Sequence, residues 1–201
     1  MSVSFENSQT KQNLMRAFAG ESQARNRYTF SAGFARKQGL PCIEMVFLFT
    51  ANQELAHARV FYDYLEKCSG ENIQIDGTYP VDLYTTVAEH LRAAEHNEMQ
   101  EYEHDYTSFA KVAKEEGFPE ISHVFSQIAR IEQIHGERFG QFAQLIEDNK
   151  LFISDVECQW MCLNCGYVVT ATRPPEMCPV CKHQQGYFVR MEMVPWQMKQ
   201  S

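Results

Sequence analysis

The stretch ISHVFSQIARIEQIHGERFGQFAQLI, residues 121–146, carries apolar residues at alternating intervals of four and three, the spacing of one face of an α-helix. A carboxylate and an imidazole, Glu132 and His135, stand in the middle of this apolar stripe. Three residues of a helix rise about 4.5 Å and turn through about 300°, so both side chains share the buried face. A buried, unpaired carboxylate costs several kcal/mol. The stretch therefore predicts a helix whose apolar face carries a carboxylate and an imidazole at its middle.

A second Glu-x-x-His pair, Glu54 and His57, stands on an apolar stripe over residues 43–64 with the same spacing. One such pair, taken alone, is usually a solvated surface feature. Two pairs on two apolar stripes instead indicate a shared buried site, because an uncompensated charge would destabilise each helix.

Single carboxylates accompany each pair at a nearly constant distance along the chain. Glu21 precedes Glu54 by 33 residues, and Glu98 precedes Glu132 by 34, so the first half of this region looks like a repeat of the second. One Glu from each of two helices and Glu-x-x-His from two others is the ligand pattern of di-iron carboxylate bundles. Ligation rich in oxygen, with one imidazole per metal, suits iron or manganese.

The spacing leaves two questions open on the helices that carry the single carboxylates. Glu95 and Glu101 both lie three residues from Glu98, so either could join it in the site. Tyr28 and Tyr106 fall near the same seam, where they are core residues or hydrogen-bond donors to the ligands.

Gly- and Pro-containing breaks divide the first 150 residues into four predicted helices. These cover residues 8–36, 42–67, 82–116 and 119–148. Two short connections flank one long connection at 69–81, which is the order of a ferritin-like bundle. We expect a mainly α protein, with a ferritin-like four-helix bundle over residues 1–150 and a small rubredoxin-like β domain over residues 151–201.

Four of the seven cysteines form two CxxC pairs, Cys162 with Cys165 and Cys178 with Cys181. This arrangement closes a tetrahedral site of four sulfurs and indicates metal rather than disulfides in a cytosolic chain. Zinc ribbons use the same pairs. Attachment to a di-iron bundle favours iron, because a redox site that turns over needs an electron supply.

The composition excludes several classes of partner. The formal net charge is −8, and no cluster of Lys and Arg marks a site for nucleic acid or an anionic membrane. No apolar run approaches the roughly 18 residues of a membrane span, and residues 1–13 lack the features of a signal peptide. We therefore expect a cytoplasmic protein with neither nucleic acid nor membrane as a partner.

Taken together, these features resemble the rubrerythrin family over nearly the whole chain. The matching stretches are Ala17 to Tyr28, Gln53-Glu54 with His57, Glu98-x-x-Glu101-Tyr102 with Tyr106, Glu132-x-x-His135 with Arg138-Phe139, and Cys162 to Cys181. The resemblance selects Glu101, not Glu95, as the partner of Glu98.

The resemblance also implies a role for each ligand. Glu54 and Glu132 are expected to bridge two irons, and Glu98 and His135 to complete one of them. Glu21 and Glu101 would complete the other iron, where His57 replaces Glu101 on reduction. The two tyrosines, Tyr28 and Tyr106, would hydrogen-bond the ligand carboxylates.

The activity that the resemblance implies is reduction of hydrogen peroxide to water, as protection against oxidative stress. Electrons would pass from an NAD(P)H-dependent reductase or a rubredoxin to the Cys₄ iron and then to the di-iron site of a homodimer. This chain has no glycine-rich nucleotide motif of its own. The alternatives are a ferroxidase or iron-handling ferritin relative, which would need no built-in relay, and a binding module that holds zinc. The crossover at 69–81 is a few residues longer than the family leads us to expect.

Overall fold

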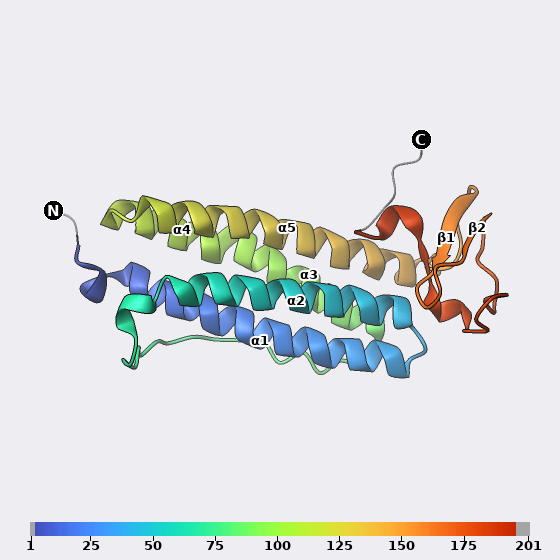
Figure 1. Ribbon diagram of the computed structural model, residues 1–201, viewed down its shortest axis with the longest axis horizontal. Helices are drawn as coiled ribbons and strands as arrows, with labels where there is room; N and C mark the ends of the chain where they lie inside the picture. Colours follow the sequence, from blue (N-terminus) through green and yellow to red (C-terminus); the bar gives the residue numbers. More distant parts are fainter. Residues whose placement is uncertain (1–2, 196–201) are drawn as a thin grey trace.

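Four antiparallel helices and a small sheet at one end of them make up the fold (Figure 1). The structure, a computed structural model, describes residues 3–195. The helices are α1 (Gln9–Lys37), α2 (Pro41–Asp63), α3 (Val87–Gln100) with α4 (Tyr106–Glu116), and α5 (Pro119–Glu147). Within residues 3–195, no helix combines the length and the apolar character needed to cross a membrane. The predicted fold class is confirmed.

The crossover between α2 and α3 is longer than predicted. The apolar spacing predicts that the third helix begins at residue 82, but α3 begins at Val87, and Leu83 is an exposed residue of the crossover. A capping box sets this start: the Thr86 hydroxyl accepts from the Glu89 N–H, and the Glu89 carboxylate accepts from the Thr86 N–H. These bonds satisfy the N–H groups of Thr86 and Glu89 at the start of the helix, which the helix itself leaves without partners.

One π-helical turn, Glu101–Asp105, interrupts the third helix of the bundle. The sequence pattern predicts an uninterrupted helix here. In an α-helix Glu98 and Tyr106, eight residues apart, would differ by about 80° around the axis. The extra residue held by the π turn reduces this to about 20°, so that both side chains face the same buried seam.

The core of the bundle consists of two apolar clusters, one on each side of its middle. One cluster contains Phe47 and Phe139, and the other contains Phe61 and Phe125. The buried polar side chains lie between them. The apolar stripes read from the sequence therefore enclose a polar centre on all sides.

The C-terminal part is a three-stranded antiparallel sheet in the order β2-β1-β3. Its strands are β1 (Cys158–Cys162), β2 (Val168–Ala171) and β3 (Phe188–Arg190). Trp160 fills its core and donates from Nε1 to the Ala171 carbonyl over 2.9 Å. Gly186 lies so close to the bundle that a Cβ there would be 2.0 Å from the Gly39 carbonyl oxygen.

The connection between α5 and β1 contains the domain boundary predicted at residue 150. Residues 196–201 of the predicted small domain lie outside the described residues. The division into these two domains stays a prediction.

Glu116, in the last turn of α4, closes the end of the bundle that lies opposite the sheet (Figure 1). Its carboxylate accepts from the N–H of Gln9 at 2.9 Å, and from the N–H and hydroxyl of Thr10 at 2.8 and 2.6 Å. A side chain 106 residues further along the chain thus caps the first turn of α1. Burial acts to raise the pKa of Glu116, but the hydrogen bonds from Thr10 and Gln9 outweigh it and lower the pKa.

We predict that Glu116→Ala destabilises the protein by about 1–2 kcal/mol at neutral pH, the size of a lost helix cap. Urea unfolding of the metal-free protein measures it, with the exposed neighbour Glu115→Ala as control. Because the pKa of Glu116 is lowered in the folded state, the difference is present above the unfolded pKa of about 4.3 and shrinks as the pH falls below it. Equal stability of the two variants at neutral pH would contradict this cap.

Candidate metal centres

Six acidic and imidazole side chains from all four helices of the bundle converge at its middle. They form two groups whose ligand atoms lie within 4.8 Å of one another: Glu21, Glu54, His57 and Glu132 in one, and Glu54, Glu98, Glu132 and His135 in the other. Each residue is at most 7% exposed. Glu54 and Glu132 belong to both groups, so their two carboxylate oxygens reach both positions.

His135 is the imidazole of one group. Its Nδ1 lies 2.8 Å from Glu132 Oε2 and 3.0 Å from Glu54 Oε1, and 3.6 Å from Glu98 Oε2. Glu132 is one turn away on α5, whereas the other two carboxylates come from α2 and α3. Three helices therefore define the first position.

His57 is the imidazole of the other group. Its Nδ1 lies 3.0 Å from Glu132 Oε1 and 3.1 Å from Glu54 Oε2. The third carboxylate, Glu21 of α1, is 3.7 Å away. The two imidazole rings lie 5.7 Å apart and nearly parallel, which leaves each with its own set of carboxylate oxygens.

The hydrogen bonding of the ligand atoms indicates what these groups hold. Six buried ligand atoms have no hydrogen-bond partner: Glu21 Oε2, Glu54 Oε1, Glu98 Oε2, both oxygens of Glu132, and His135 Nδ1. Burial raises the pKa of Glu98 to about 8 and that of Glu21 well above its usual range. Without cations this centre would therefore take up protons, and two cations relieve the repulsion that the fold otherwise imposes.

Two buried tyrosines hold the terminal carboxylates. The Tyr106 hydroxyl donates to Glu21 Oε1 at 2.6 Å, and the Tyr28 hydroxyl donates to Glu98 Oε1 in a shorter bond. In each case the other oxygen of the carboxylate is left free. Both tyrosines are thus hydrogen-bond donors to the site, and they fix the orientation of a ligand.

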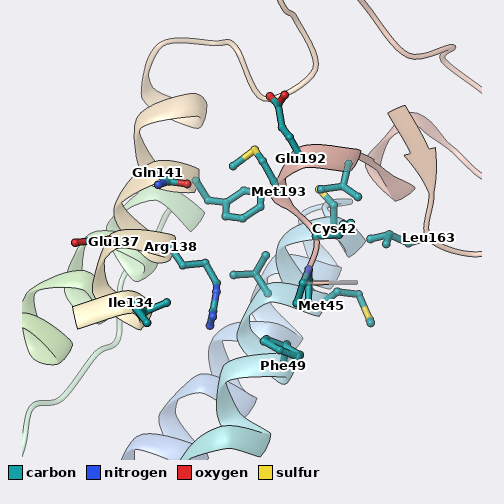
Figure 2. A pocket seen from close by; sticks show the side chains of 15 residues that line it. Cys42, Met45, Phe49, Ile134, Glu137, Arg138, Gln141, Leu163, Glu192 and Met193 are labelled. Atoms are coloured by element: carbon teal, nitrogen blue, oxygen red, sulfur yellow. The ribbon is translucent and has the colours of Figure 1, made fainter. Parts of the chain in front are cut away.

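A contact that the sequence analysis missed fixes the ring of His135. Its Nε2 lies 3.1 Å from Gln53 Oε1, which also accepts from Arg138 Nη1 at 3.3 Å. Since an amide oxygen only accepts, Nε2 carries the proton and Nδ1 is free for a metal. Arg138 also donates to the Thr50 hydroxyl and lies over the Phe49 ring, beside the cavity between bundle and sheet (Figure 2). The available signals were position, since Gln53 precedes Glu54 and Arg138 follows His135 by three residues, and the presence of both residues in the stretches that carry the family resemblance.

The structure distinguishes Glu95 from Glu101, which the spacing along the sequence could not do. Glu95 pairs with Arg92 at 2.7 Å on the outside of the bundle, away from both groups. Glu101 begins the π turn, belongs to neither group, and is half-buried in a cavity beneath the crossover. His57, not Glu101, faces the position beside Glu21 in this structure. A ligand role for Glu101 stays a prediction.

The four predicted sulfurs, those of Cys162, Cys165, Cys178 and Cys181, form a second candidate centre in the sheet domain. Sγ of Cys162 and Cys181 are 3.7 Å apart, and those of Cys165 and Cys178 are 3.6 Å apart. For metal–sulfur bonds of about 2.3 Å, the edges of a tetrahedron are roughly 3.8 Å. The sulfurs are therefore spaced as a single tetrahedral metal requires, and Cys158 is not part of the group.

The two CxxC loops share one backbone design. Each ends in a residue with positive φ directly after its second cysteine, Gly166 at 77° and Lys182 at 64°. In each loop the N–H of that residue donates to the carbonyl of the first cysteine. Near-identical loops on opposite sides of the site explain why the four sulfurs close symmetrically. Cys162 and Cys178 are buried, while Cys165 is exposed.

Comparison with known protein families matches both parts of the chain. The rubrerythrin family model covers residues 12–143, and the model of the rubrerythrin rubredoxin-like domain covers residues 160–189. These ranges contain the carboxylate centre and the four cysteines.

Individual relatives match nearly the whole chain. A rubrerythrin of Porphyromonas gingivalis is 44% identical, over 96% of this chain and 94% of its own length. A rubrerythrin of Nitratidesulfovibrio vulgaris is 40% identical, over 92% of this chain and 95% of its own length. A solved structure of nigerythrin in a mixed-valence state superposes with a TM-score of 0.62 at 29% identity, covering 94% of this chain and 91% of that one.

We predict that Glu98→Ala abolishes metal binding in the bundle and leaves the Cys₄ centre intact, because only the former loses a ligand. Iron content should fall from about three to about one per chain, with the thiolate-to-iron absorption unchanged. Glu95→Ala on the same helix is the matched control and should keep full iron content. Loss of both centres in Glu98→Ala would show that they are not independent.

Proposed function

The chain belongs to the rubrerythrin family, and we propose that it reduces hydrogen peroxide to water in defence against oxidative stress. Its two metal centres are a di-iron site in the bundle and a Cys₄ iron site in the rubredoxin-like domain. Relatives of this kind imply an oxidoreductase. The substrate and the relay described below are our proposal.

The observation that carries the proposal is the presence of a buried two-metal centre and a one-electron centre in the same chain. Reduction of one peroxide molecule consumes two electrons and two protons and yields two molecules of water. Two ferrous ions, when bound, supply both electrons together, which avoids release of a hydroxyl radical. An iron held by Cys162, Cys165, Cys178 and Cys181 would supply one-electron chemistry, which suits it to return the electrons to the bundle one at a time.

We assign the ligands of the bundle as the sequence analysis predicted. Glu54 and Glu132, which reach both positions, would bridge the irons, and Glu98 with His135 would complete the first iron. At the second iron, Glu21 would be joined by either His57 or Glu101. The closeness of His57 to Glu21, with Glu101 in the adjacent cavity, supports an exchange of these two ligands between redox states.

The position of the sheet supports a homodimer as the working unit. Twelve residues of α5 separate His135 from the end of the helix at Glu147, a rise of about 18 Å, and the Cys₄ site lies beyond that end (Figure 1). Electron tunnelling slows steeply over such a distance. A two-fold symmetric, antiparallel pair of chains would bring the Cys₄ iron of one chain close to the di-iron site of the other.

The external electron donor is proposed to be an NAD(P)H-dependent reductase or a rubredoxin. The chain itself has no dinucleotide-binding motif. Cys165, the exposed ligand of the Cys₄ site, offers the donor a point of approach.

We predict that the anaerobically reduced, iron-loaded protein is reoxidised by stoichiometric peroxide at least about 100-fold faster than by the same concentration of oxygen. Stopped-flow absorbance of the two centres measures both reactions. Oxygen reacting as fast as peroxide would remove the main support for a peroxidase and would favour a ferroxidase.

A second prediction concerns the dimer. Glu98→Ala, which lacks the di-iron site, and the double variant Cys162→Ser/Cys178→Ser, which lacks the Cys₄ site, should each be inactive in a peroxidase assay with an external donor. Heterodimers of the two, isolated by different affinity tags, should regain about half of the wild-type activity, because one complete pair of centres forms across the interface. Transfer within one chain instead predicts inactive heterodimers. The control is iron analysis, which should find one di-iron site and one Cys₄ site per heterodimer.

A further inference from the structure

Gly20 is a buried glycine in the middle of α1, directly before Glu21. Glycine inside a helix lowers stability relative to alanine, so its presence calls for a reason. Close packing is not the reason, because a Cβ built on Gly20 would meet no atom within 4 Å. The space that a side chain would occupy is open.

That space belongs to a cavity of about 380 Å³ between α1 and the third helix of the bundle. Arg16, Gly20 and Gln23 line it from one face of α1, and the opposite wall includes Glu101 and Tyr106. The Tyr106 hydroxyl donates to Glu21, so the inner wall of the cavity is in contact with the carboxylate centre. Three other cavities along residues 3–195 have no side chain of that centre in their linings.

The crossover forms the roof of the cavity and runs along α1 (Figure 1). Two ion pairs with α1 hold it. The pair of Arg27 with Asp82 is buried, whereas Asp76, which meets Arg16 at 2.5 Å, has a side chain that is 87% exposed. An exposed pair contributes little to stability, so the Asp76 side of the roof opens more readily than the Asp82 side.

The lining favours a small neutral molecule over an anion. Both arginines of the lining are already paired with aspartates of the crossover. The remaining charged groups, Glu101 and Asp105, are carboxyls, which disfavour an anion. Gln23, Asn97 and Gln100 add hydrogen-bonding groups that suit a polar molecule.

We propose that this cavity is the route by which hydrogen peroxide reaches the di-iron site, and that Gly20 keeps the route open. The choice of peroxide rests on the proposed function above. The inference that the cavity leads to the metal site does not need peroxide as the substrate. It rests on Gly20, on the empty space beside it and on the position of the cavity against Glu21.

A size series at residue 20 tests this inference on iron-loaded protein. Gly20→Ala should react with peroxide about two- to threefold more slowly than wild type, because even a methyl group narrows the route, while Gly20→Met and Gly20→Leu should react at least tenfold more slowly. Gly33→Leu is the matched control, because Gly33 lies on the same helix with no atom within 4 Å of its Cβ but is exposed and lines a different cavity. It should keep the wild-type rate.

A second readout does not depend on peroxide. In protein loaded with Mn²⁺ in place of iron, water-proton relaxation reports how freely solvent reaches the metals. Gly20→Leu should lower the relaxation enhancement, and Gly33→Leu should leave it unchanged. Should wild-type protein show no preference for peroxide while this difference persists, the proposed function fails and the route stands.

Wild-type reactivity in Gly20→Leu, with metal content intact, would overturn the inference. Should the leucine variant not load metal, the methionine variant decides in the same way, because its flexible side chain fills the cavity with less strain. Unchanged relaxation in whichever of these two variants loads Mn²⁺ would also overturn it.

Discussion

Repulsion among buried carboxylates is the constraint on which the rest of this structure depends. Glu54 and Glu132 lie in an apolar bundle with oxygens that have no hydrogen-bond partner, and the arrangement is stable only when cations or bound protons offset the repulsion. The aromatic clusters on both sides exclude the water that would otherwise screen the charges. Tyr28, Tyr106 and Gln53 then hold single atoms of the ligands, so that the fold presents a preformed site.

Periodicity predicted the parts of the site that lie on regular helices. The intervals of three and four around Glu132 and His135 were enough to place both in the core, and the cysteine pairs were enough to predict the Cys₄ site. Spacing could not choose between Glu95 and Glu101, because the π turn changes the helical phase just where the choice arises. No periodic signal marks a π turn or a hydrogen bond such as that of Gln53, since both depend on neighbouring helices.

The capping box illustrates the same limit at a helix end. Leu83 fits the apolar spacing of α3, yet Thr86 and Glu89 start the helix after it and leave it exposed. Local hydrogen bonding thus outweighed hydrophobic pattern over one turn. The consequence is a longer crossover, and that crossover covers the cavity beside the carboxylate centre.

The contact between Gly186 and the Gly39 carbonyl places the sheet domain against the bundle at a point where no side chain fits. Any larger residue at 186 would collide with the Gly39 carbonyl and tilt the small domain relative to the bundle. The direction in which the Cys₄ centre faces therefore depends in part on the absence of a side chain at residue 186, which is far along the chain from any ligand of the bundle. A substitution at this contact between sheet and bundle would change which surface of the Cys₄ domain meets an electron donor, while every metal ligand stays in place.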